Sequence, residues 1–460
     1  RWNCDWSSDV CSSDLFQNAE DGLPAFWKHY MPQAAAPLRY GGIAPTTTPL
    51  TAYDFALSPV RHESKRGFQM LVFTDPQTAS MTDVGYYERA IVAPLAGKTR
   101  ARMGATLGDI ANDDLSLYPA INKVTTQLGV PWFHVPGNHD LDFDAGSDAR
   151  SLDSWRAVYG PDTYAVEEGG ASFVFLDDVV YDPKARPTYV GGLREDQFAF
   201  IAAYLKGLPR DRLLVLGMHI PLFDAAPGRE TFRRPDRQRL FALLQPFRNI
   251  LVLSGHSHTQ QHYYHSREQG WQGAAPLHEY NVGANCGAFW SGVKDRHGVP
   301  DSTMSDGTPK GYALLDVAGN GTYRLQYRVA GATQDEQIGL HAPRVLRQGA
   351  YPAWGVFANV YMGEDATRVE FRVDGGDWRP MKQVRQGDPR LQVENVADDL
   401  ATALRGYDRS PEATPSPHLW RGALPTDLAL GEHNVEVRAT QPDGSVFNAS
   451  TRYALQTAEP

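Results

Sequence analysis

The chain has 460 residues, a length that corresponds to about three domains of roughly 150 residues and excludes a single small binding module. Lysine and arginine total 44 against 54 aspartates and glutamates, and the net charge of −10 is spread along the chain, which disfavours a broad nucleic-acid footprint. The composition, 42% hydrophobic and 21% charged, is that of a globular protein, and no stretch reaches the ~18 uncharged apolar residues of a membrane span.

Residues 1–15 show neither the apolar periodicity of a helix or strand nor the basic and apolar regions of a signal peptide. They resemble translated sequencing-adapter read-through, so we expect a non-native leader that includes Cys4 and Cys11, with the true N-terminus missing. A disordered extracellular leader with one disulfide is the alternative. Cys286 is then the single credible cysteine, which excludes a disulfide framework and a cysteine-ligated zinc site.

Residues 16–62 are rich in proline and threonine, and they predict a linker or the remnant of a truncated N-terminal domain. Over residues 63–335, short apolar runs alternate with amphipathic segments, which predicts a layered α/β domain. The expected strands are residues 68–73, 103–107, 132–135, 173–176, 213–218 and 250–253. The expected helices are one capped by Thr82, residues 115–128, a segment around 198–205, and one between Pro235 and Pro246.

Beyond about Asp335 no helical period persists, and apolar and charged residues alternate instead. Val369, Phe371 and Val373 interleave with charged residues before an Asp-Gly-Gly turn, as half-buried strands do. Residues 336–460 are therefore predicted to form an antiparallel, all-β sandwich domain.

Polar side chains follow the predicted strands of the α/β region at their carboxyl ends. A single Asp, Asn or His at such a position is usually a helix cap or a turn former. Ligands in open α/β sheets bind outside the carboxyl ends of the strands, so a whole series of such residues predicts one shared site. The series is Asp75 and Gln77, Asp109, Asn138 and His139, His219, and His256 with His258.

The motifs of this series identify a family. Asp75-Pro76-Gln77, Gly108-Asp109, Gly137-Asn138-His139-Asp140, His219 and Gly255-His256-Ser257-His258 closely resemble the calcineurin-like metallophosphoesterases. The segments 286–292, 306–312 and 419–421 look like the bacterial subgroup with an extra domain on each side of the core. The resemblance implies a layered metallophosphatase core, a central β sandwich flanked by helices, with a truncated N-terminal domain and a C-terminal β-sandwich.

The resemblance also implies two divalent metal ions, with manganese favoured over iron, zinc or magnesium. One ion would be held by Asp75, Gln77, Asp109 and His258. The other would be held by Asp109, Asn138, His219 and His256, so that Asp109 bridges the two. A metal-bound hydroxide would then attack a phosphate mono- or diester, a nucleotide or a pyrophosphate.

His139 follows a ligand directly, so we expect it to reach the leaving oxygen as general acid, with Asp113 or Asp140 as the orienting carboxylate. Gln77 stands where the wider family has histidine, and its carbonyl oxygen suits manganese better than zinc. Asn112 and Asp113 mark a second departure, because the family often has aspartate at the position of Asn112.

Other candidates have plainer interpretations. His262 and His265 alternate with tyrosines as in a strand, His134 is expected in the core, and Asp224 in a turn. Asn281, Phe289 and Trp290 either pack in the core or stack on a substrate base. Cys286 has no histidine partner at a recognisable spacing, which argues against a thiol nucleophile.

The expected function is a dinuclear phosphoesterase with a small phosphorylated substrate as its partner. A catalytically silent binding or surface protein on the same fold is the alternative, because fold does not determine function. The family resemblance implies export to the periplasm or cell surface, although no signal segment is present in the sequence.

Overall fold

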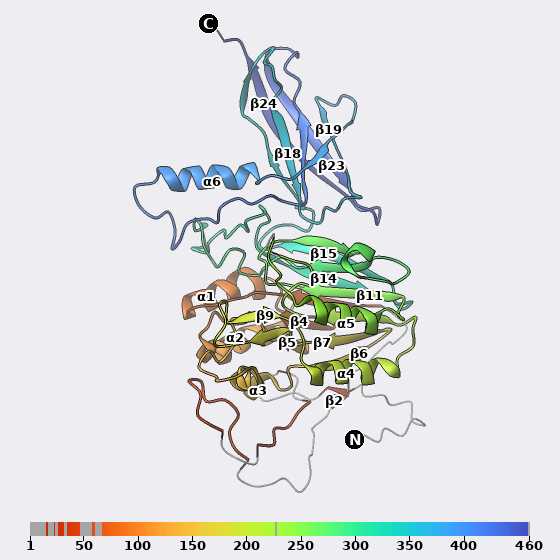
Figure 1. Cartoon of the computed structure of the whole chain (residues 1–460). Coiled ribbons are helices and arrows are strands. Elements are labelled where there is room, and N and C mark those ends of the chain that lie inside the picture. The colour runs from red at the N-terminus through yellow and green to blue at the C-terminus, as the bar shows by residue number, and fades with distance from the viewer. Residues whose placement is uncertain are drawn as a thin grey trace. The chain divides into compact units, whose positions relative to one another are not determined.

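The computed structural model describes residues 15–16, 23, 26–31, 35–46, 58–59, 67–225 and 228–458. Nearly all of the expected leader, including Cys4 and Cys11, lies outside these residues. The described residues divide into two compact units (Figure 1): those within 1–257, 263–282 and 313–325 form the first, and those within 258–262, 283–312 and 326–460 the second. In the described part of the chain, every helix is too short or too polar to cross a membrane.

Two β-sheets form the layers of the first unit, with the strand orders β12-β13-β11-β10-β7-β6 and β15-β14-β3-β4-β5. The first sheet contains β6 (Tyr164–Glu168), β7 (Ala171–Phe175), β10 (Leu213–Gly217), β11 (Asn249–Ser254), β12 (Gln261–His265) and β13 (Leu277–Asn281). The second contains β3 (Phe68–Phe73), β4 (Met103–Leu107), β5 (Trp132–Val135), β14 (Gly311–Val317) and β15 (Tyr323–Val329). Two short ribbons pair β1 (Leu15–Phe16) with β2 (Ser58–Pro59) and β8 (Val179–Tyr181) with β9 (Tyr189–Gly191).

The central strands of each sheet are parallel: β3, β4 and β5 in one, and β7, β10, β11 and β13 in the other. Aromatic side chains join the two sheets face to face. The rings of Phe68 on β3 and Phe173 on β7 lie 6.1 Å apart, and Phe133 on β5 stacks on Phe175 at 5.8 Å. This confirms the predicted layered core, in which central strands buried on both faces are nearly all apolar.

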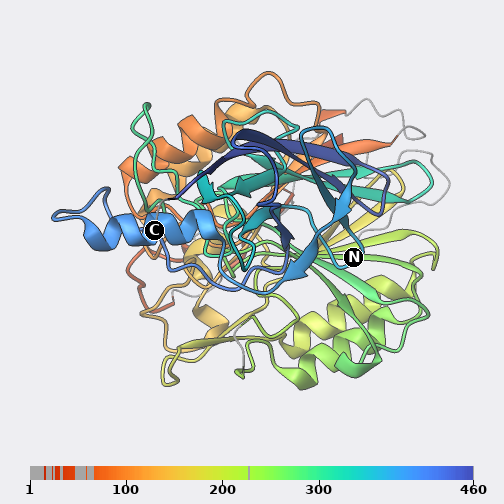
Figure 2. The same cartoon turned by 90° about the horizontal axis from the view of Figure 1, so that it is seen from above.

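Helices flank the sheets, as predicted. They are α1 (Met81–Tyr87), α2 (Tyr118–Thr125), α3 (Asp153–Tyr159), α4 (Glu195–Lys206) and α5 (Arg234–Leu244). Figure 2 shows the green pair α4 and α5 on one side of the strands and the orange α1 on the other. The cap of α1 was predicted wrongly: Ser80, not Thr82, accepts a hydrogen bond from the Asp83 N–H at 3.3 Å.

Short 3₁₀ and π turns extend the first unit's helices or stand between elements. The π turn is Glu88–Val92, and the 3₁₀ turns are Leu115–Leu117, Thr126–Leu128, Asp148–Arg150 and Arg267–Gln269. Two of these 3₁₀ turns enclose α2, so the single helix expected over residues 115–128 is a composite of three helical pieces.

Described parts of the expected linker make side-chain contacts with the α/β domain. The His29 ring bonds the Arg156 carbonyl on α3 at 2.8 Å, and the Gly42 N–H donates to the Ser154 hydroxyl at 3.1 Å. Leu38 is buried. This part of the linker region is thus packed onto α3.

The second unit contains the predicted β-sandwich, which is antiparallel except for the parallel pair of β17 and β24. One sheet has β16 (Ile338–His341), β18 (Gly355–Val360), β21 (Lys382–Val384) and β22 (Leu419–Ala423). The other has β17 (Val345–Arg347), β19 (Arg368–Val373), β20 (Arg379–Pro380), β23 (Gly431–Thr440) and β24 (Val446–Gln456). The alternating residues Val369, Phe371, Val435 and Val437 point into its apolar core, as the pattern predicts.

The expectation that helical structure ends near Asp335 is wrong. Helix α6 (Pro389–Leu400) lies in the second unit, with the Asp388 side chain accepting from the Arg390 N–H at its start. Only Pro389 and Leu391 of this helix are buried, whereas Val393, Val396 and Leu400 are exposed. Its apolar positions therefore lack the continuous buried stripe by which a helix is recognised in a sequence.

Candidate metal centre

The predicted series of polar residues follows β3, β4, β5, β10 and β11 where these strands end. Asp109 follows β4, while His219 and His256 follow β10 and β11 in the other sheet. One ligand atom from each of these three residues lies within 4.8 Å of the other two. The carboxyl ends of both sheets therefore meet, and they bring together residues that are far apart in the sequence.

His219 is buried at the centre of this cluster. Its Nδ1–H donates to the Leu107 carbonyl at 2.8 Å, which leaves the lone pair on Nε2. Nε2 lies 3.2 Å from Asp109 Oδ2 and 3.1 Å from Asn138 Oδ1. A lone pair directed at two oxygen atoms is stable only with a proton or cation between them, so this donor set fits a divalent metal ion.

The electrostatics of the cluster lead to the same conclusion. Burial by itself raises the pKa of the Asp109 carboxyl, but the charge and hydrogen bond of His219 outweigh burial and bring that pKa below its usual range. Burial lowers the pKa of His219, yet the Asp109 carboxylate reverses this and raises the pKa to about 10. Without a metal ion, His219 therefore favours its protonated form, and this proton supplies the positive charge that the surrounding oxygen atoms favour.

Asp75 and Gln77 are held beside this cluster by the backbone. The Asp75 N–H donates to the Gly108 carbonyl at 3.1 Å, and the Gln77 N–H donates to the Asp109 carbonyl at 2.9 Å. The Asp75 carboxylate accepts from the Thr74 hydroxyl and, at 3.1 Å, from the His256 N–H. Both side chains are buried at the same strand ends as Asp109 and His256.

Backbone strain is concentrated at these positions. Asp75, Gln77, Asp109, Asp113 and His256 all have positive φ angles, between 39° and 69°, although none is a glycine. Such conformations cost on the order of 1–3 kcal/mol each and persist only where the surroundings enforce them. Strain of this kind is typical of functional sites.

Glycines allow the close packing of this region. A Cβ at Gly137 would overlap the backbone and carboxylate of Asp109, and one at Gly108 would lie 2.5 Å from His219 Nδ1. The glycines of the Gly-Asp and Gly-Asn-His-Asp motifs are therefore required by the close approach of neighbouring ligand residues.

His139 and Asp113 form a pair at the exposed side of the cluster. His139 Nδ1 lies 2.8 Å from Asp113 Oδ1, and the His139 N–H donates to Asp109 Oδ1 at 2.8 Å. Burial lowers the pKa of His139, but Asp113 and Asp109 outweigh it and the pKa is raised. With Nδ1 directed at Asp113, Nε2 is the ring atom left for a reacting group.

Asp140 has different partners. Its carboxylate accepts from the N–H groups of Ile110 at 3.1 Å, Ala111 at 3.2 Å and Gly137 at 2.9 Å, and from the Tyr118 hydroxyl at 2.9 Å. It therefore ties the loop after β4 to the loop after β5. Of the two carboxylates expected to orient His139, only Asp113 has a hydrogen bond to the ring.

His258 belongs to the second unit and has a positive φ of 47°. Its Nδ1 bonds the Gly287 carbonyl at 2.7 Å, and its ring stacks on Phe289 with centroids 4.3 Å apart. Phe289 is exposed and Trp290 is buried, so the two candidate stacking residues have different environments. The Cys286 Sγ atom lies 3.7 Å from His258 Nδ1. The spacing of the two residues along the chain did not indicate this contact.

The remaining candidates have structural contacts. His134 is buried, which lowers its pKa to about 3, and its ring lies 4.2 Å from that of Tyr159. The Asn281 amide donates to the Gly255 carbonyl at 2.6 Å, so it supports the turn that carries His256. Asp224 is exposed and lies 4.0 Å from an Arg237 nitrogen.

Tyr189 was missed at the sequence level. Its ring lies 6.0 Å from the His256 ring at 86°, and burial, reinforced by the nearby Asp109 charge, raises its pKa to about 12. Tyr189 belongs to β9, a strand of three residues. No local sequence pattern indicates that this strand lies beside the loop after β11.

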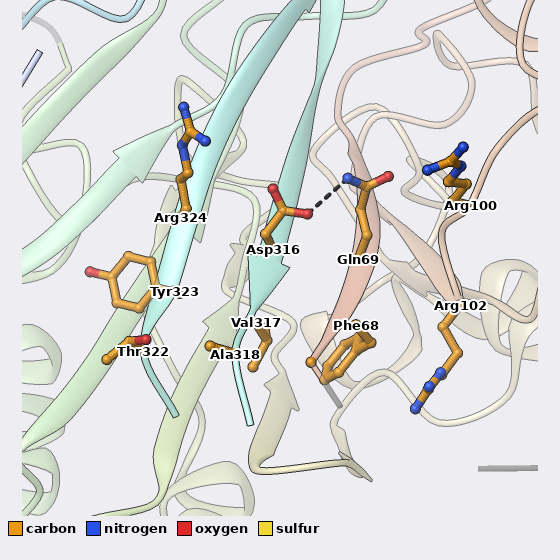
Figure 3. Close-up of a pocket in the computed structure, with 11 residues that line it drawn as sticks. Phe68, Gln69, Arg100, Arg102, Asp316, Val317, Ala318, Thr322, Tyr323 and Arg324 are labelled. Atoms are coloured by element: carbon orange, nitrogen blue, oxygen red, sulfur yellow. Dashed lines mark hydrogen bonds between the residues drawn. The ribbon is translucent and has the colours of Figure 1, made fainter. Parts of the chain in front are cut away.

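A pocket of about 480 Å³ lies at the opposite, amino-terminal ends of β3 and β4 (Figure 3). Arg100, Arg102 and Gln69 line it, but the Arg102 guanidinium is paired with Glu168 at 2.6 Å, and Gln69 bonds Asp316 at 2.8 Å. None of the predicted ligands lines this pocket, so it is separate from the candidate metal centre.

Comparisons with known proteins agree with this geometry. A family model described as calcineurin-like phosphoesterase matches residues 105–260, and one described as the C terminal of calcineurin-like phosphoesterase matches residues 279–447. No curated protein matches the sequence.

Solved structures with some similarity include two phosphatases. A dimetal phosphatase from Danio rerio is 16% identical, with a TM-score of 0.38, over 56% of this chain and 98% of its own. A purple acid phosphatase from seeds of yellow lupin (Lupinus luteus) is 14% identical, with a TM-score of 0.41, over 60% of this chain and 55% of its own.

Proposed function

The chain belongs to the calcineurin-like phosphoesterase family and is a metal-dependent phosphoric ester hydrolase; from this premise we propose that it cleaves a small phosphate mono- or diester, such as a nucleotide, or a pyrophosphate. The observation that supports this most is the convergence of Asp109, His219 and His256 from two sheets. A carboxylate and two imidazoles in one buried cluster are suited to a catalytic divalent metal ion.

We assign two ions to the ligand sets that the motifs imply. Asp75, Gln77, Asp109 and His258 hold one, and Asp109, Asn138, His219 and His256 hold the other. When bound, two divalent ions lower the pKa of water and draw charge from the phosphoryl oxygens. Their charge of +4 exceeds the −2 of Asp75 and Asp109, because histidine, asparagine and glutamine are neutral ligands. The surplus favours a phosphate anion in this cluster.

His139 is the residue that handles the leaving group. Its Nδ1–H is held by the Asp113 carboxylate, which fixes the ring and stabilises the protonated form. The pKa of His139 is raised, which favours a ring that carries a proton on Nε2. Nε2 then delivers this proton to the departing oxygen, a step that matters for alkoxides and little for good leaving groups.

Manganese is proposed as the activating metal, and the periplasm or cell surface as the location. The amide oxygen of Gln77 makes its site richer in oxygen, which suits manganese better than zinc. The location follows from the resemblance to the exported subgroup, and fractionation of the source cells would measure it. Recovery only in the cytoplasm would contradict this location.

The test is an assay of the purified full chain with added Mn²⁺. Substrates are 4-nitrophenyl phosphate, bis(4-nitrophenyl) phosphate, nucleotides and nucleotide sugars, and elemental analysis measures the bound metal. We expect two metal equivalents and Mn²⁺-dependent hydrolysis of at least one class. His219→Ala should abolish activity, whereas His278→Ala, a histidine of β13 bonded to the Tyr323 hydroxyl at 2.7 Å, should preserve it.

Two outcomes would contradict the proposal. Tight metal binding without hydrolysis of any substrate class would favour a catalytically silent binding protein. No metal binding, together with no stabilisation on titration with metal, would reject the metal centre itself.

A further inference from the structure

The two histidines of the cluster leave adjacent strands at the centre of the six-stranded sheet. His219 follows β10 and His256 follows β11, while β7 lies beside β10 and β13 lies beside β11. Each flanking strand brings a buried carboxyl group to this region: Asp178 just after β7, and Glu279 within β13. Neither Asp178 nor Glu279 is among the proposed ligands or proton donors.

Glu279 connects the two histidine-bearing loops. Its Oε1 accepts from the Leu222 N–H at 3.0 Å and from the Ser254 hydroxyl at 2.8 Å. Leu222 lies three residues after His219, and Ser254 lies two residues before His256. Its Oε2 lies 2.7 Å from His265 Nε2, and both side chains are completely buried.

Asp178 holds the His219 backbone from the other side. Its Oδ1 accepts from the His219 N–H at 3.0 Å, and the Ile220 N–H also bonds the carboxyl group. The second oxygen, Oδ2, is buried and has no hydrogen-bond partner among the described residues. The Gly192 N–H bonds the Asp178 carbonyl at 2.9 Å, which fixes the backbone of Asp178.

Burial of two carboxyl groups is unfavourable unless their hydrogen bonds offset the loss of hydration. A sheet built only for stability would place apolar residues at such positions. Here the carboxyl groups accept hydrogen bonds from backbone and side-chain donors in the segments that carry His219 and His256. The second of these has a φ of 69°, a strained conformation that persists only when neighbouring contacts enforce it.

We propose that Asp178 and Glu279 are positioning residues that set the spacing of His219 and His256 and thereby the affinity of the metal ion these histidines bind. This inference rests on the proposed function, since it assumes that both histidines are ligands. It adds one residue just after β7 and one within β13. Both act on the metal ion through the loops that carry the histidines, without contact with the ion.

The chain contains a matched control. Glu168 is also a buried glutamate of the six-stranded sheet with an ion-pair partner, the Arg102 guanidinium at 2.6 Å. It lies at the end of β6 and pairs with Ala171, the first residue of β7. Glu168 is therefore at the amino-terminal end of the parallel strands, whereas the histidine loops are at their carboxyl ends. Loss of Glu168 should affect stability without affecting the metal.

The experiment compares Glu279→Ala, Glu279→Gln and Glu168→Ala in the full chain by titration of the metal-free protein with Mn²⁺ and by thermal unfolding without metal. We expect Glu279→Ala to weaken Mn²⁺ binding by about 10- to 100-fold. Glu279→Gln retains an acceptor oxygen and should lie within about threefold of wild type. Glu168→Ala should lower the unfolding temperature with Mn²⁺ affinity unchanged.

Asp178 is tested in the same titration. Asp178→Asn keeps an acceptor for the His219 N–H and should bind Mn²⁺ like wild type, whereas Asp178→Ala should bind it about tenfold more weakly. If Glu279→Ala fails to fold, Ser254→Ala removes one Glu279 hydrogen bond with little loss of packing and should weaken binding by a few-fold.

The outcomes separate the two proposals. A wild-type chain that binds no metal rejects the proposed function and this inference with it. A wild-type chain that binds Mn²⁺, together with folded alanine variants of unchanged affinity, rejects only the positioning role. An equal loss of affinity in Glu168→Ala would also reject it, because general destabilisation would then explain the result.

Discussion

The loops at the carboxyl ends of the core strands and the turns of the C-terminal sandwich both need left-handed backbone, but they obtain it differently. In the sandwich, Gly375, Gly431 and Gly444 take the positive φ angles. In the core loops, residues with functional side chains take them, among them Asp75 and His256. The sandwich turns avoid strain, whereas the core loops keep strain where the candidate ligands are.

Contacts explain why the strained loops are stable. The Asp75 and Gln77 backbones are bonded to the loop after β4, and the His256 N–H is bonded to the Asp75 carboxylate. Among the described residues of the sandwich, the comparable one is Asp374, with a φ of 51° and hydrogen bonds to His433 and Asn434. In both of these places hydrogen bonds hold the strained backbone, and in the core the strained residues include proposed ligands.

Replacement of Asp109 should give the largest effect. Asp109→Asn removes the negative charge shared by both proposed metal sites, so we expect turnover to fall on the order of 10⁴-fold, equivalent to the several kcal/mol that metal ions supply. Steady-state assays with Mn²⁺ and elemental analysis measure it. Full activity and full metal content would show that strain at Asp109 serves the fold alone.

His139→Ala should lower turnover by about 10²- to 10⁴-fold for esters with poor leaving groups. The loss should be smaller for 4-nitrophenyl phosphate, because nitrophenolate departs without a proton. Metal content should be unchanged. Equal losses on both kinds of substrate would contradict the general-acid role.

A pair of glycine substitutions compares the two regions directly. A Cβ at Gly137 overlaps Asp109, so Gly137→Ala should displace a ligand and lower kcat/KM by about 10²-fold. Gly444 has a φ of 85° and open space around it, so Gly444→Ala should cost only about 1 kcal/mol of stability with activity unchanged. Enzyme kinetics and thermal unfolding measure both variants. Unchanged kinetics in Gly137→Ala would mean that the core loops tolerate displacement.

Gln77→His tests the metal preference of the first proposed site. An imidazole nitrogen binds zinc and iron more strongly than an amide oxygen does, so affinity for these metals should rise on the order of tenfold, without loss of activity. Titration of wild type and variant in one buffer measures the ranking of metals. An unchanged ranking would indicate that Gln77 does not bind the ion.

The smallest effect is expected at the strained turn of the sandwich. The Asp374 carboxylate accepts a hydrogen bond from the His433 ring and raises the pKa of His433 above 6.5. The stability that this bond contributes is therefore complete below pH 6.5 and is lost as pH rises through the folded-state pKa. Because Asp374 is half exposed, the effect should be below about 1 kcal/mol. Thermal unfolding between pH 5 and 8 should show this loss in wild type and not in His433→Gln. If the variant shows the same loss of stability with rising pH, a group other than His433 is responsible for that loss.

Much of the fold was predictable because local patterns suffice for it. Buried parallel strands have continuous apolar runs, and the strands expected at residues 68–73, 103–107 and 132–135 match β3, β4 and β5. Helix α6 was not predictable, since most of its apolar residues are exposed. The cap of α1 was misplaced because Ser80 and Thr82 are chemically equivalent candidates two residues apart.

The candidate ligands, taken alone, were also indicated by the sequence, because each follows a predicted strand and matches a family motif. Their partners were not. Asp113 and Asp140 were equal candidates for the hydrogen bond to His139, and only the path of the loops after β4 and β5 directs Asp113 to the ring. Tyr189 lies near His256 through long-range packing of β9, for which no spacing rule exists.

The sequence by itself determined the layered core, the sandwich and the order of the ligand-bearing strand ends, because hydrophobic periodicity and motif order are local properties of the chain. Only the tertiary structure decided which carboxyl groups support those ligands. Asp178 and Glu279 owe their contacts with the His219 and His256 loops to the order of strands in the sheet. Strand order is set by packing among residues distant in sequence, and that information appears only when the chain has folded.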